Sequence, residues 1–534
     1  MSATAGTHER ALAERGVRKG LGAYYTPPDV VAGLLDLVLD PLLAERSADG
    51  VEAVAGVRIL DPACGTGNFL LAAVDRIASA LMTLGVEPAE AARRAVRCVR
   101  GIEIDDATAR LCRTALRSVH PDGGGRSIVR GDALLGERSV PRGSFDLVVG
   151  NPPFLNQLAS STARSRADAV ALRARFGAAV GPYTDPAAVF LLAALDAARP
   201  DGGVVCLIEP IGLLSARDAG GVRTEALARA ALRTLWVAGE RVFDADVEVC
   251  APVLVRGAGP GPAAVVRGRA FQPGPVVAGP VEADPSWASL LGAVQDLPER
   301  ALRTDGVLGD IADAAADFRD QYYGLAGAVA DDDDGPRLIT SGLIDPAELC
   351  WGARPCRFNK VAYQHPRVVL DRLSPPMRDW AGRRLVPKVL VAAQTRVPEV
   401  VVDEQGELLP SVPVVSVTAR SGDPADLWRI AALLSSPPVA LEAARRHLGS
   451  GRNATALRLS TTDLLALPLP PDAGAWDRAA GAFRSASVSS DPAERRGHLR
   501  AGARSSCEAF GLPGDDALVD WWEDRLPRSD AARR

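Results

Sequence analysis

The sequence predicts an α/β fold class: a Rossmann-like, doubly wound and largely parallel sheet in the first half of the chain, followed by a mixed α+β domain. Two observations support this prediction. Between residues 57 and 255, short runs of valine, isoleucine and leucine take turns with helical patterns. Runs of this kind, without polar alternation, are typical of parallel strands buried on both faces. After residue 255 the chain becomes rich in glycine and proline, which indicates a passage into a different domain.

The elements of the first half follow in chain order. Strands are expected at 57–60, 98–104, 127–131, 145–150, 202–209, 234–238 and 247–255. Helices are expected at 69–82, 107–119, 186–198 and 217–232. In the second half, KVLVAAQ and PEVVVDEQGELLPSVPVVSV are typical of β structure, whereas LWRIAALLSS and VALEAARRHL are typical of helices. We therefore expect a first domain at 1–260, a second at 261–475 and a helical tail at 476–534.

Composition limits the class of protein. The 534 residues exceed the roughly 250–300 that one core usually serves. No apolar run approaches the roughly 20 residues of a membrane span, and no signal peptide is evident. The eight cysteines form no CxxC pair and the five histidines do not cluster, so we expect no metal site, no disulfide framework and a cytoplasmic location. Only three lysines accompany many arginines, so the abundance of arginine alone says little about nucleic acid.

One glycine-rich loop and two acids point to an adenosyl ligand. The segment LDPACGTGNFLLA (60–72) follows a strand and opens a helix, where Gly65 and Gly67 let the backbone approach a ligand closely. Glu103 ends the next strand and suits the two hydroxyls of a ribose, and Asp132 ends the strand after it and suits an adenine amine. Each acid alone could equally be a helix cap or a surface charge.

The motifs DPACGTG, GIEID, GDAL and GNPPF, in this order, resemble S-adenosylmethionine-dependent DNA methyltransferases that act on amino groups. The chain is most similar to the gamma-class N6-adenine enzymes of restriction–modification systems, with AYYTPPDVVAGLLDLV (23–38) matching their TP motif. The resemblance implies S-adenosylmethionine as the cofactor and a C-terminal target-recognition domain. It also implies that Thr26 faces the methionine end of the cofactor. The expected cofactor-binding residues are Thr26, Asp61, Pro62, Ala63, Cys64, Gly65, Gly67, Glu103, Ile104, Asp132 and Ala133.

The NPPF motif supplies a reason for ending a buried strand in polar and rigid residues. The lone pair of an exocyclic adenine amine is delocalised into the ring, so two acceptors aimed at its N–H bonds would free it for attack. The Asn151 side-chain carbonyl and the Pro152 backbone carbonyl suit this task, and Pro152 and Pro153 restrict the backbone. Phe154 offers a face for a flipped base. The resemblance implies that Phe243 stacks on the other side of that base, although Phe243 could instead be a core residue.

The NPPF motif does not by itself name the substrate. Release-factor glutamine methyltransferases and some ribosomal-RNA methyltransferases share an NPPF-like motif, but the TP motif before the cofactor loop and the large domain after the catalytic one favour DNA adenine. A non-catalytic DNA-specificity or defence-complex subunit is the alternative from another class. Residues 351–400 hold ten basic residues against three acidic ones, which suits double-stranded DNA or merely a solvated face. About twenty residues precede the TP motif, so we expect a modification enzyme with any restriction endonuclease encoded separately.

Overall fold

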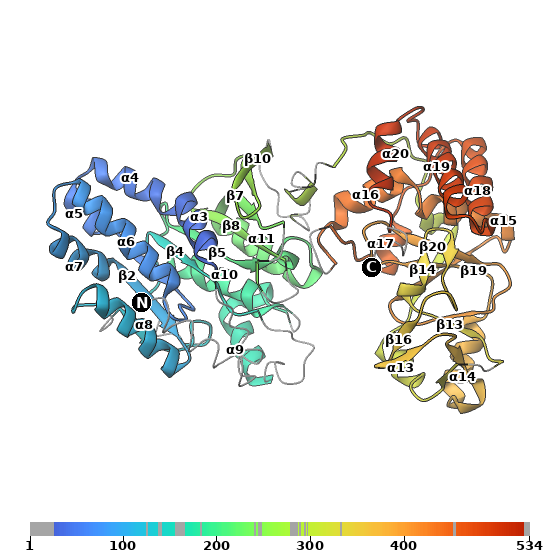
Figure 1. Ribbon diagram of the computed structural model, residues 1–534, viewed down its shortest axis with the longest axis horizontal. Coiled ribbons are helices and arrows are strands. Elements are labelled where there is room, and N and C mark those ends of the chain that lie inside the picture. The colour runs from blue at the N-terminus through green and yellow to red at the C-terminus, as the bar shows by residue number, and fades with distance from the viewer. Residues whose placement is uncertain are drawn as a thin grey trace. The chain divides into compact units, whose positions relative to one another are not determined.

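The protein folds into two compact units. The computed structural model describes residues 26–123, 127–136, 141–154, 166–181, 184–239, 242–243, 248–277, 287, 290–292, 295, 297–331, 334–451 and 455–527. Unit 1 comprises Met1–Gln295 with Arg452–Ala454, and unit 2 comprises Asp296–Gly451 with Thr455–Arg534 (Figure 1).

Unit 1 is built on a ten-stranded sheet with the main strand order β10-β9-β7-β8-β5-β4-β1-β2-β3. Five strands from β3 to β5 are mutually parallel: β1 (Ile59–Asp61), β2 (Val99–Glu103), β3 (Ile128–Arg130), β4 (Leu147–Gly150) and β5 (Val204–Leu207). The strand β8 (Val249–Arg256) runs antiparallel to β5 and to β7 (Ala230–Val237), and the short β6 (Glu209–Pro210) pairs with it. The parallel part of the sheet confirms the predicted α/β fold class.

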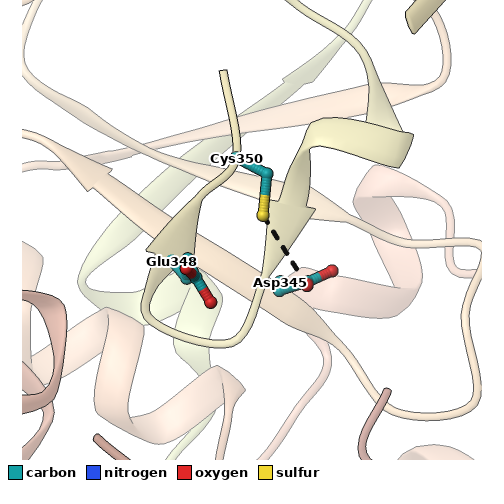
Figure 2. A group of neighbouring side chains, drawn as sticks. All are labelled: Asp345, Glu348 and Cys350. Atoms are coloured by element: carbon teal, nitrogen blue, oxygen red, sulfur yellow. Dashed lines mark hydrogen bonds between the residues drawn. The ribbon is translucent and has the colours of Figure 1, made fainter. Parts of the chain in front are cut away.

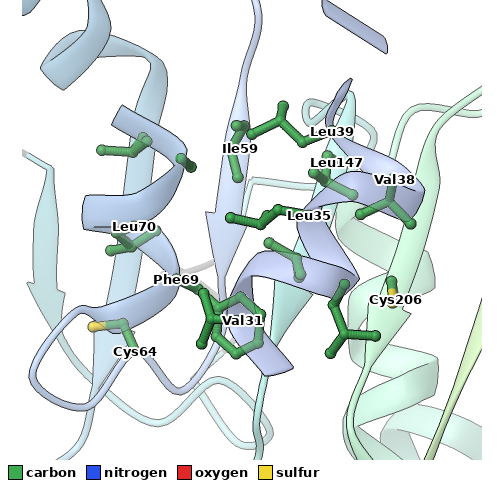
Figure 3. Close-up of a cluster of buried hydrophobic side chains, with 14 of the residues drawn as sticks. Val31, Leu35, Val38, Leu39, Ile59, Cys64, Phe69, Leu70, Leu147 and Cys206 are labelled. Carbon is green, nitrogen blue, oxygen red and sulfur yellow. The ribbon is translucent and has the colours of Figure 1, made fainter. Parts of the chain in front are cut away.

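Among the residues that the structure describes, three helices precede β1, and others fill the connections between the strands. They are α3 (Pro28–Val38), α4 (Asp40–Ala48), α5 (Val51–Ala55), α6 (Asn68–Thr83), α7 (Pro88–Cys98), α8 (Asp106–Val119), α9 (Arg166–Phe176), α10 (Pro186–Ala197) and α11 (Gly220–Arg229), with 3₁₀ turns η1 (Gly177–Ala179), η2 (Ile211–Leu214) and η3 (Arg217–Ala219). Figure 3 shows how the core forms: Val31 and Leu35 of α3 and Phe69 of α6 pack beside Ile59 and Leu147 of the sheet. All five side chains are buried, so α3 and α6 are fixed against the strands that end at the site.

The sheet extends further along the chain than the sequence predicted. The strand β9 (Ala263–Arg267) pairs in parallel with β7, and β10 (Gln272–Val277) pairs with β9 at the edge. Two prolines lie in β10, which an edge strand tolerates because one side of it makes no ladder bonds. The prolines made this segment resemble a linker, so the boundary expected at 260/261 cuts through the sheet. The compact units instead divide after Gln295.

One helix also ends earlier than expected. The helix predicted at 217–232 stops at Arg229, because Ala230 already begins the apolar strand β7. The run ALRTLWV is buried along most of its length, and burial in the sheet outweighs the helical propensity of its alanine and leucine residues.

Unit 2 is mixed α+β, as predicted. One antiparallel sheet has the order β11-β22-β19-β20, and a second sheet has the order β12-β18-β13-β21. The strands are β11 (Ala312–Ala316), β12 (Val329–Ala330), β13 (Arg337–Ile339), β14 (Ile344–Asp345), β15 (Glu348–Leu349), β16 (Cys356–Phe358), β17 (Val361–Tyr363), β18 (Arg367–Val368), β19 (Lys388–Ala392), β20 (Glu399–Asp403), β21 (Leu408–Pro410) and β22 (Val414–Ala419).

Helices cover much of unit 2. They are α13 (Arg319–Gly324), α14 (Pro375–Arg384), α15 (Pro424–Leu434), α16 (Pro437–His447), α17 (Thr461–Leu465), α18 (Ala473–Val488), α19 (Pro492–Ala509) and α20 (Asp516–Glu523), with η4 (Leu308–Asp310), η5 (Ser341–Leu343) and η6 (Leu370–Arg372). The tail expected as a separate segment at 476–534 is helical, but it is part of unit 2. Trp476 donates from Nε1 to the Arg429 carbonyl at 2.8 Å, which ties α18 to α15. Within the described part of the chain, no helix combines the length and the apolar character needed to cross a membrane.

A truncation test follows from the corrected boundary. A fragment ending at Gly261 would lose β9, β10 and Phe271, whose ring stacks on Trp236 at 5.2 Å between centroids. Fully burying a phenylalanine is worth roughly 1.5–3 kcal/mol, and Phe271 is partly buried against the core. We expect the fragment ending at Gln295 to melt cooperatively by circular dichroism and the fragment ending at Gly261 to melt at a clearly lower temperature or to aggregate. Equal melting temperatures would contradict this boundary.

Candidate active site

The glycine-rich loop leads from β1 into α6 in a conformation that only glycine adopts easily. Gly65 and Gly67 have φ angles of 54° and 98°. A Cβ atom on Gly67 would lie 2.7 Å from the Cys112 sulfur on α8, so space and conformation both require glycine there. The Cys64 N–H donates to the Ile102 carbonyl at 2.9 Å and joins the loop to β2. The loop is thereby held against the ends of two parallel strands, with the N-terminus of α6 directly after it.

Glu103 braces this loop. Its Oε2 accepts from the Gly65 N–H at 3.0 Å, and its Oε1 accepts from the Asp105 N–H at 2.9 Å. Burial raises the pKa of the Glu103 carboxyl above its ordinary value, while the backbone N–H groups oppose that rise. Each carboxylate oxygen keeps a further lone pair, so Glu103 can hold the loop and still accept from a ligand hydroxyl. Its neighbour Ile104 is exposed.

Asp132 lies at the end of the next strand but is occupied locally. Its Oδ1 accepts from the Leu134 and Leu135 N–H groups at 2.8 and 3.1 Å. These contacts are the capping role that was the alternative interpretation of this acid. Ala133 is buried directly after it, and its carbonyl accepts from Arg175 at 2.9 Å.

A close contact joins the cofactor loop to the NPPF segment. Asp61 is buried, and its Oδ1 accepts from the Ala63 N–H at 3.0 Å. A Cβ atom on Gly150 would collide with the Asp61 carboxylate, so residue 150 must be glycine for the two strand ends to meet. Burial raises the pKa of Asp61 from its ordinary value near 3.8 to about 7, and the Glu103 carboxylate adds to that rise. The sequence indicated Asp61 as a site residue but did not show that position 150 must be glycine.

Asn151 follows Gly150 and reaches the start of α3. Its Nδ2 donates to the Thr26 hydroxyl oxygen at 3.1 Å, across 125 positions of sequence. Pro62 lies in the same turn as Asp61, and Pro152 is buried beside the half-buried Asn151 and Pro153. The structure therefore brings the TP motif and the NPPF motif into direct contact.

Phe154 and Phe243 also meet. Their ring centroids are 6.0 Å apart with an interplanar angle of 70°, an edge-to-face contact, and both side chains are buried. The burial of Phe243 agrees with its interpretation as a core residue. Its contact with Phe154 agrees with the interpretation that the two rings bind a flipped base. A base between the two rings requires one of them to turn, because edge-to-face rings at this distance leave no slot between parallel faces.

Together these residues fit the cofactor that the sequence implied. The loop offers backbone N–H groups at a helix N-terminus, and Glu103 and Asp132 offer acceptors at the ends of two successive strands. Asp61 adds a buried carboxylate that a cationic ligand would favour in its charged form. This donor set suits an adenosyl group with a positively charged methionine end.

One buried acid escaped sequence reasoning. Glu209 follows β5, is fully buried, and has no hydrogen-bond partner for either carboxylate oxygen in the described part of the chain. Burial, with a further contribution from Asp185, raises the pKa of Glu209 well above its ordinary value. The preceding Ile208 N–H donates to the Gly150 carbonyl at 3.0 Å, which places Glu209 near the NPPF segment. The available signal was a charged residue directly after the apolar run VVCLI.

Unit 2 holds a group of potential metal ligands that arginines occupy. Figure 2 shows Asp345, Glu348 and Cys350 around the β14–β15 hairpin, with the Cys350 thiol 3.7 Å from Asp345. Arg354 lies 2.7 Å from the Asp345 carboxylate, and Arg495 lies 2.6 Å from Glu348. A cation would have to displace both guanidinium groups, so we assign no metal to this cluster.

The basic segment 351–400 is less available to DNA than its composition indicates. Several of its basic side chains form ion pairs with acidic residues of unit 2. Arg384 pairs with Asp317 at 2.7 Å, and the buried Lys388 pairs with Asp403 at 2.5 Å. The exposed cations that remain are Arg357, Lys360, Arg372, Arg378, Arg383 and Arg396.

Comparisons with known proteins agree with this site. Residues 10–258 match the family described as N-6 DNA Methylase. Over 148 residues the chain is 35% identical to the Type II methyltransferase M.BstVI of Geobacillus stearothermophilus, covering 26% of this chain and 25% of that protein. Over 146 residues it is 30% identical to the Type II methyltransferase M.XhoI of Xanthomonas vasicola, covering 26% and 25%. The chain thus matches about a quarter of the length of these curated relatives.

One solved structure resembles nearly the whole chain. The type IIL restriction-modification enzyme MmeI, solved in complex with DNA, aligns with 95% of this chain and 78% of its own, with a TM-score of 0.63 and 13% identity. At this identity the likeness concerns the fold.

Unit 1 has a Rossmann-like fold, with a glycine-rich loop at the carboxyl ends of its parallel strands. Residues 10–258 match the N-6 DNA Methylase family model, which agrees with the family that the motifs indicated.

The raised pKa of Asp61 makes stability depend on pH. Because the folded value, about 7, lies above the ordinary value near 3.8, ionisation of Asp61 costs folded-state stability as pH rises through this range. The cost reaches up to roughly 4 kcal/mol by pH 8. Asp61→Asn mimics the protonated form, so its melting temperature should rise relative to wild type between pH 5 and pH 8. The exposed-site control Asp201→Asn should follow wild type. Parallel curves for Asp61→Asn and wild type would contradict the assignment.

Proposed function

We propose that the protein is a site-specific DNA methyltransferase that transfers a methyl group from S-adenosylmethionine to N6 of a flipped-out adenine. The observation that carries this proposal is the junction at Gly150, where Asn151 stands beside the glycine-rich loop. The match of residues 10–258 to the N-6 DNA methylase family supports it. The named relatives, both Type II methyltransferases, support it as well.

The chemistry of the proposed transfer rests on acceptors. The Asn151 side-chain oxygen and the Pro152 carbonyl would accept from the two N–H bonds of the adenine amine and so free its lone pair. No covalent intermediate with the protein is required, and preorganised polar groups supply most of the acceleration. Bound S-adenosylmethionine would supply the methyl group through its electrophilic sulfonium.

The cofactor would be held at the ends of β1, β2 and β3. Gly65 and Gly67 admit its close approach to the backbone, Glu103 accepts from the ribose hydroxyls, and Asp132 accepts from the adenine amine. The remaining proposed contacts are Thr26, Asp61, Pro62, Ala63, Cys64, Ile104 and Ala133. Their support is the bonding pattern already described, in which Glu103 holds the glycine-rich loop and keeps a further lone pair on each carboxylate oxygen.

Unit 2 is proposed as the target-recognition domain for double-stranded DNA. Its exposed arginines and Lys360 suit phosphate contacts, and MmeI, similar to this chain in fold, was solved in complex with DNA. A separately encoded endonuclease and a cytoplasmic location complete the proposal. The eight cysteines are all buried free thiols, which suits a reducing compartment.

Methylation of RNA or of protein glutamine at the same site, and a non-catalytic DNA-specificity role, remain the competing hypotheses. No observation favours any of them over DNA adenine. A subunit that merely binds DNA would not need Asn151, nor the close packing of Asp61 that leaves room only for glycine at position 150.

Asn151→Ala should abolish transfer and spare cofactor binding. Loss of one preorganised polar group at a reacting centre costs on the order of 10²–10³ in rate, and Asn151 supplies one of two acceptors. A radiolabelled methyl-transfer assay on duplex DNA measures the rate, and calorimetry measures the affinity for S-adenosylmethionine. Glu103→Ala is the complementary variant, with weaker cofactor binding expected. Near-normal turnover of Asn151→Ala would refute the mechanism.

Replacing Phe243 separates stacking from packing. Phe243→Leu keeps most of the buried volume and removes the flat ring, so the melting temperature should change little. Base–aromatic stacking is worth roughly 1–3 kcal/mol, so the equilibrium constant for base flipping should fall by about 5- to 100-fold. The fluorescence rise of a 2-aminopurine at the target position reports this fall. Phe154→Leu should behave alike. Full fluorescence enhancement in Phe243→Leu would show that Phe243 is only a core residue.

A further inference from the structure

The Asn151 side chain has two ends that differ in chemistry and hardly in size. Its oxygen accepts hydrogen bonds, whereas its nitrogen only donates. A rotated amide would present N–H groups to an amine that also carries N–H groups, and the proposed activation would fail. The site therefore needs a contact that sets the rotation of this amide before the substrate enters.

Thr26 makes such a contact. Its hydroxyl oxygen accepts from Asn151 Nδ2 at 3.1 Å, so the amide nitrogen faces Thr26 and the amide oxygen faces the other way. The Thr26 side chain is buried, which limits competition from water. Pro27 follows directly as the N-cap of α3 and Pro28 begins the helix, so the backbone after this hydroxyl has restricted φ angles.

Two sets of contacts hold α3 in place. On one side, the Arg76 guanidinium of α6 donates to the Ala32 carbonyl at 2.9 Å and pairs with Asp36 at 2.7 Å. These bonds tie the middle of α3 to the helix that starts at the glycine-rich loop.

On the other side, α3 meets the turn between β9 and β10, defined here as the 268–271 turn. Arg269 makes two hydrogen bonds to Asp29, at 2.7 and 2.8 Å. This ion pair is partly exposed and contributes little by itself. The Phe271 ring contributes more, because it covers Gly33 so closely that a Cβ atom there would collide with it.

The Phe271 ring is itself fixed from behind. It stacks on Trp236 of β7, with ring centroids 5.2 Å apart and an interplanar angle of 11°. The Trp236 Nε1 donates to the Gly268 carbonyl at 2.9 Å, which closes the contact between β7 and the 268–271 turn. An unbroken series of contacts thus runs from the edge of the sheet through α3 to Asn151.

We propose that Thr26 is a positioning residue for Asn151, and that the 268–271 turn acts on methyl transfer by holding α3 and Thr26 in place. This inference rests on the proposed function, since it takes Asn151 as an acceptor for the substrate amine. It gives Thr26 a task beyond the cofactor contact that the resemblance implied. The two tasks separate experimentally, because one affects the transfer step and the other affects cofactor affinity.

Thr26→Val, similar in shape but without a hydroxyl, is the main test, with Thr26→Ser as the conservative rescue. The full-length protein is measured in single-turnover transfer at saturating S-adenosylmethionine, and cofactor affinity is measured by calorimetry. We expect Thr26→Val to be about 5- to 10-fold slower even at saturating cofactor, the value of one hydrogen bond, whether or not its affinity for the cofactor also falls. Thr26→Ser should return to the wild-type rate.

Thr83→Val, an exposed threonine on α6, is the matched control and should change neither quantity. A loss of affinity with an unchanged rate would overturn the inference and leave Thr26 as a cofactor contact. A serine variant as slow as the valine variant would also overturn it. If Asn151→Ala itself transfers at the wild-type rate, the proposed function fails. If Asn151→Ala is inactive and Thr26→Val is normal, only this inference fails.

The 268–271 turn is tested by Phe271→Ala and by Gly33→Ala, which forces the Phe271 ring away from α3. Each variant should slow single-turnover transfer by about 3- to 10-fold at saturating cofactor. Combined with Thr26→Val, neither should slow transfer further, because they act through the same hydroxyl. Melting curves verify folding, and Gly33→Ala serves if Phe271→Ala does not fold. Arg233→Ala, on β7 away from α3, is the control. Effects that multiply in the double variants would overturn the role of the turn.

Discussion

The contact between Asp61 and Gly150 is the constraint on which the site depends. Neighbouring parallel strands lie close together, but the loops after them usually diverge. Here the Asp61 carboxylate fills the space where a side chain on residue 150 would lie, so the cofactor loop and Asn151 start from adjoining points. Burial raises the pKa of Asp61, so its ionisation lowers the stability of the folded state. The same burial holds the cofactor loop and Asn151 next to each other.

The remaining parts of the site follow from the order of the sheet. The strands β2, β1 and β4 are consecutive, so the residues at their carboxyl ends, Glu103, Asp61 and Asn151, form a row. Glu103 extends this row by binding the Gly65 N–H, which couples the acid at one strand end to the loop at the next. A site built in this way needs few side chains, because the strands themselves set the spacing.

Sequence reasoning reached the parallel sheet and its strand-end acids because both leave local signals. An apolar run followed by Asp, Glu or Asn is readable without knowing its neighbours. Sequence reasoning missed packing requirements that arise only when distant segments of the chain come together. Gly150 is required by Asp61, and Gly33 is required by Phe271, yet neither glycine differs locally from many others. The strand β10 was hidden for another reason, since Pro273 and Pro275 are tolerated only because that strand lies at the edge of the sheet.

We propose that unit 1 methylates adenine in DNA, through the residues at the carboxyl ends of β2, β1 and β4. The most direct measurement is long-read single-molecule sequencing of DNA from cells that express the protein or its Asn151→Ala variant, in a host without other adenine methylation. The account predicts N6-methyladenine at one short sequence motif with the wild-type protein and none with the variant. Modified cytosine, or unmodified DNA with both proteins while methyl groups enter RNA or protein, would contradict it.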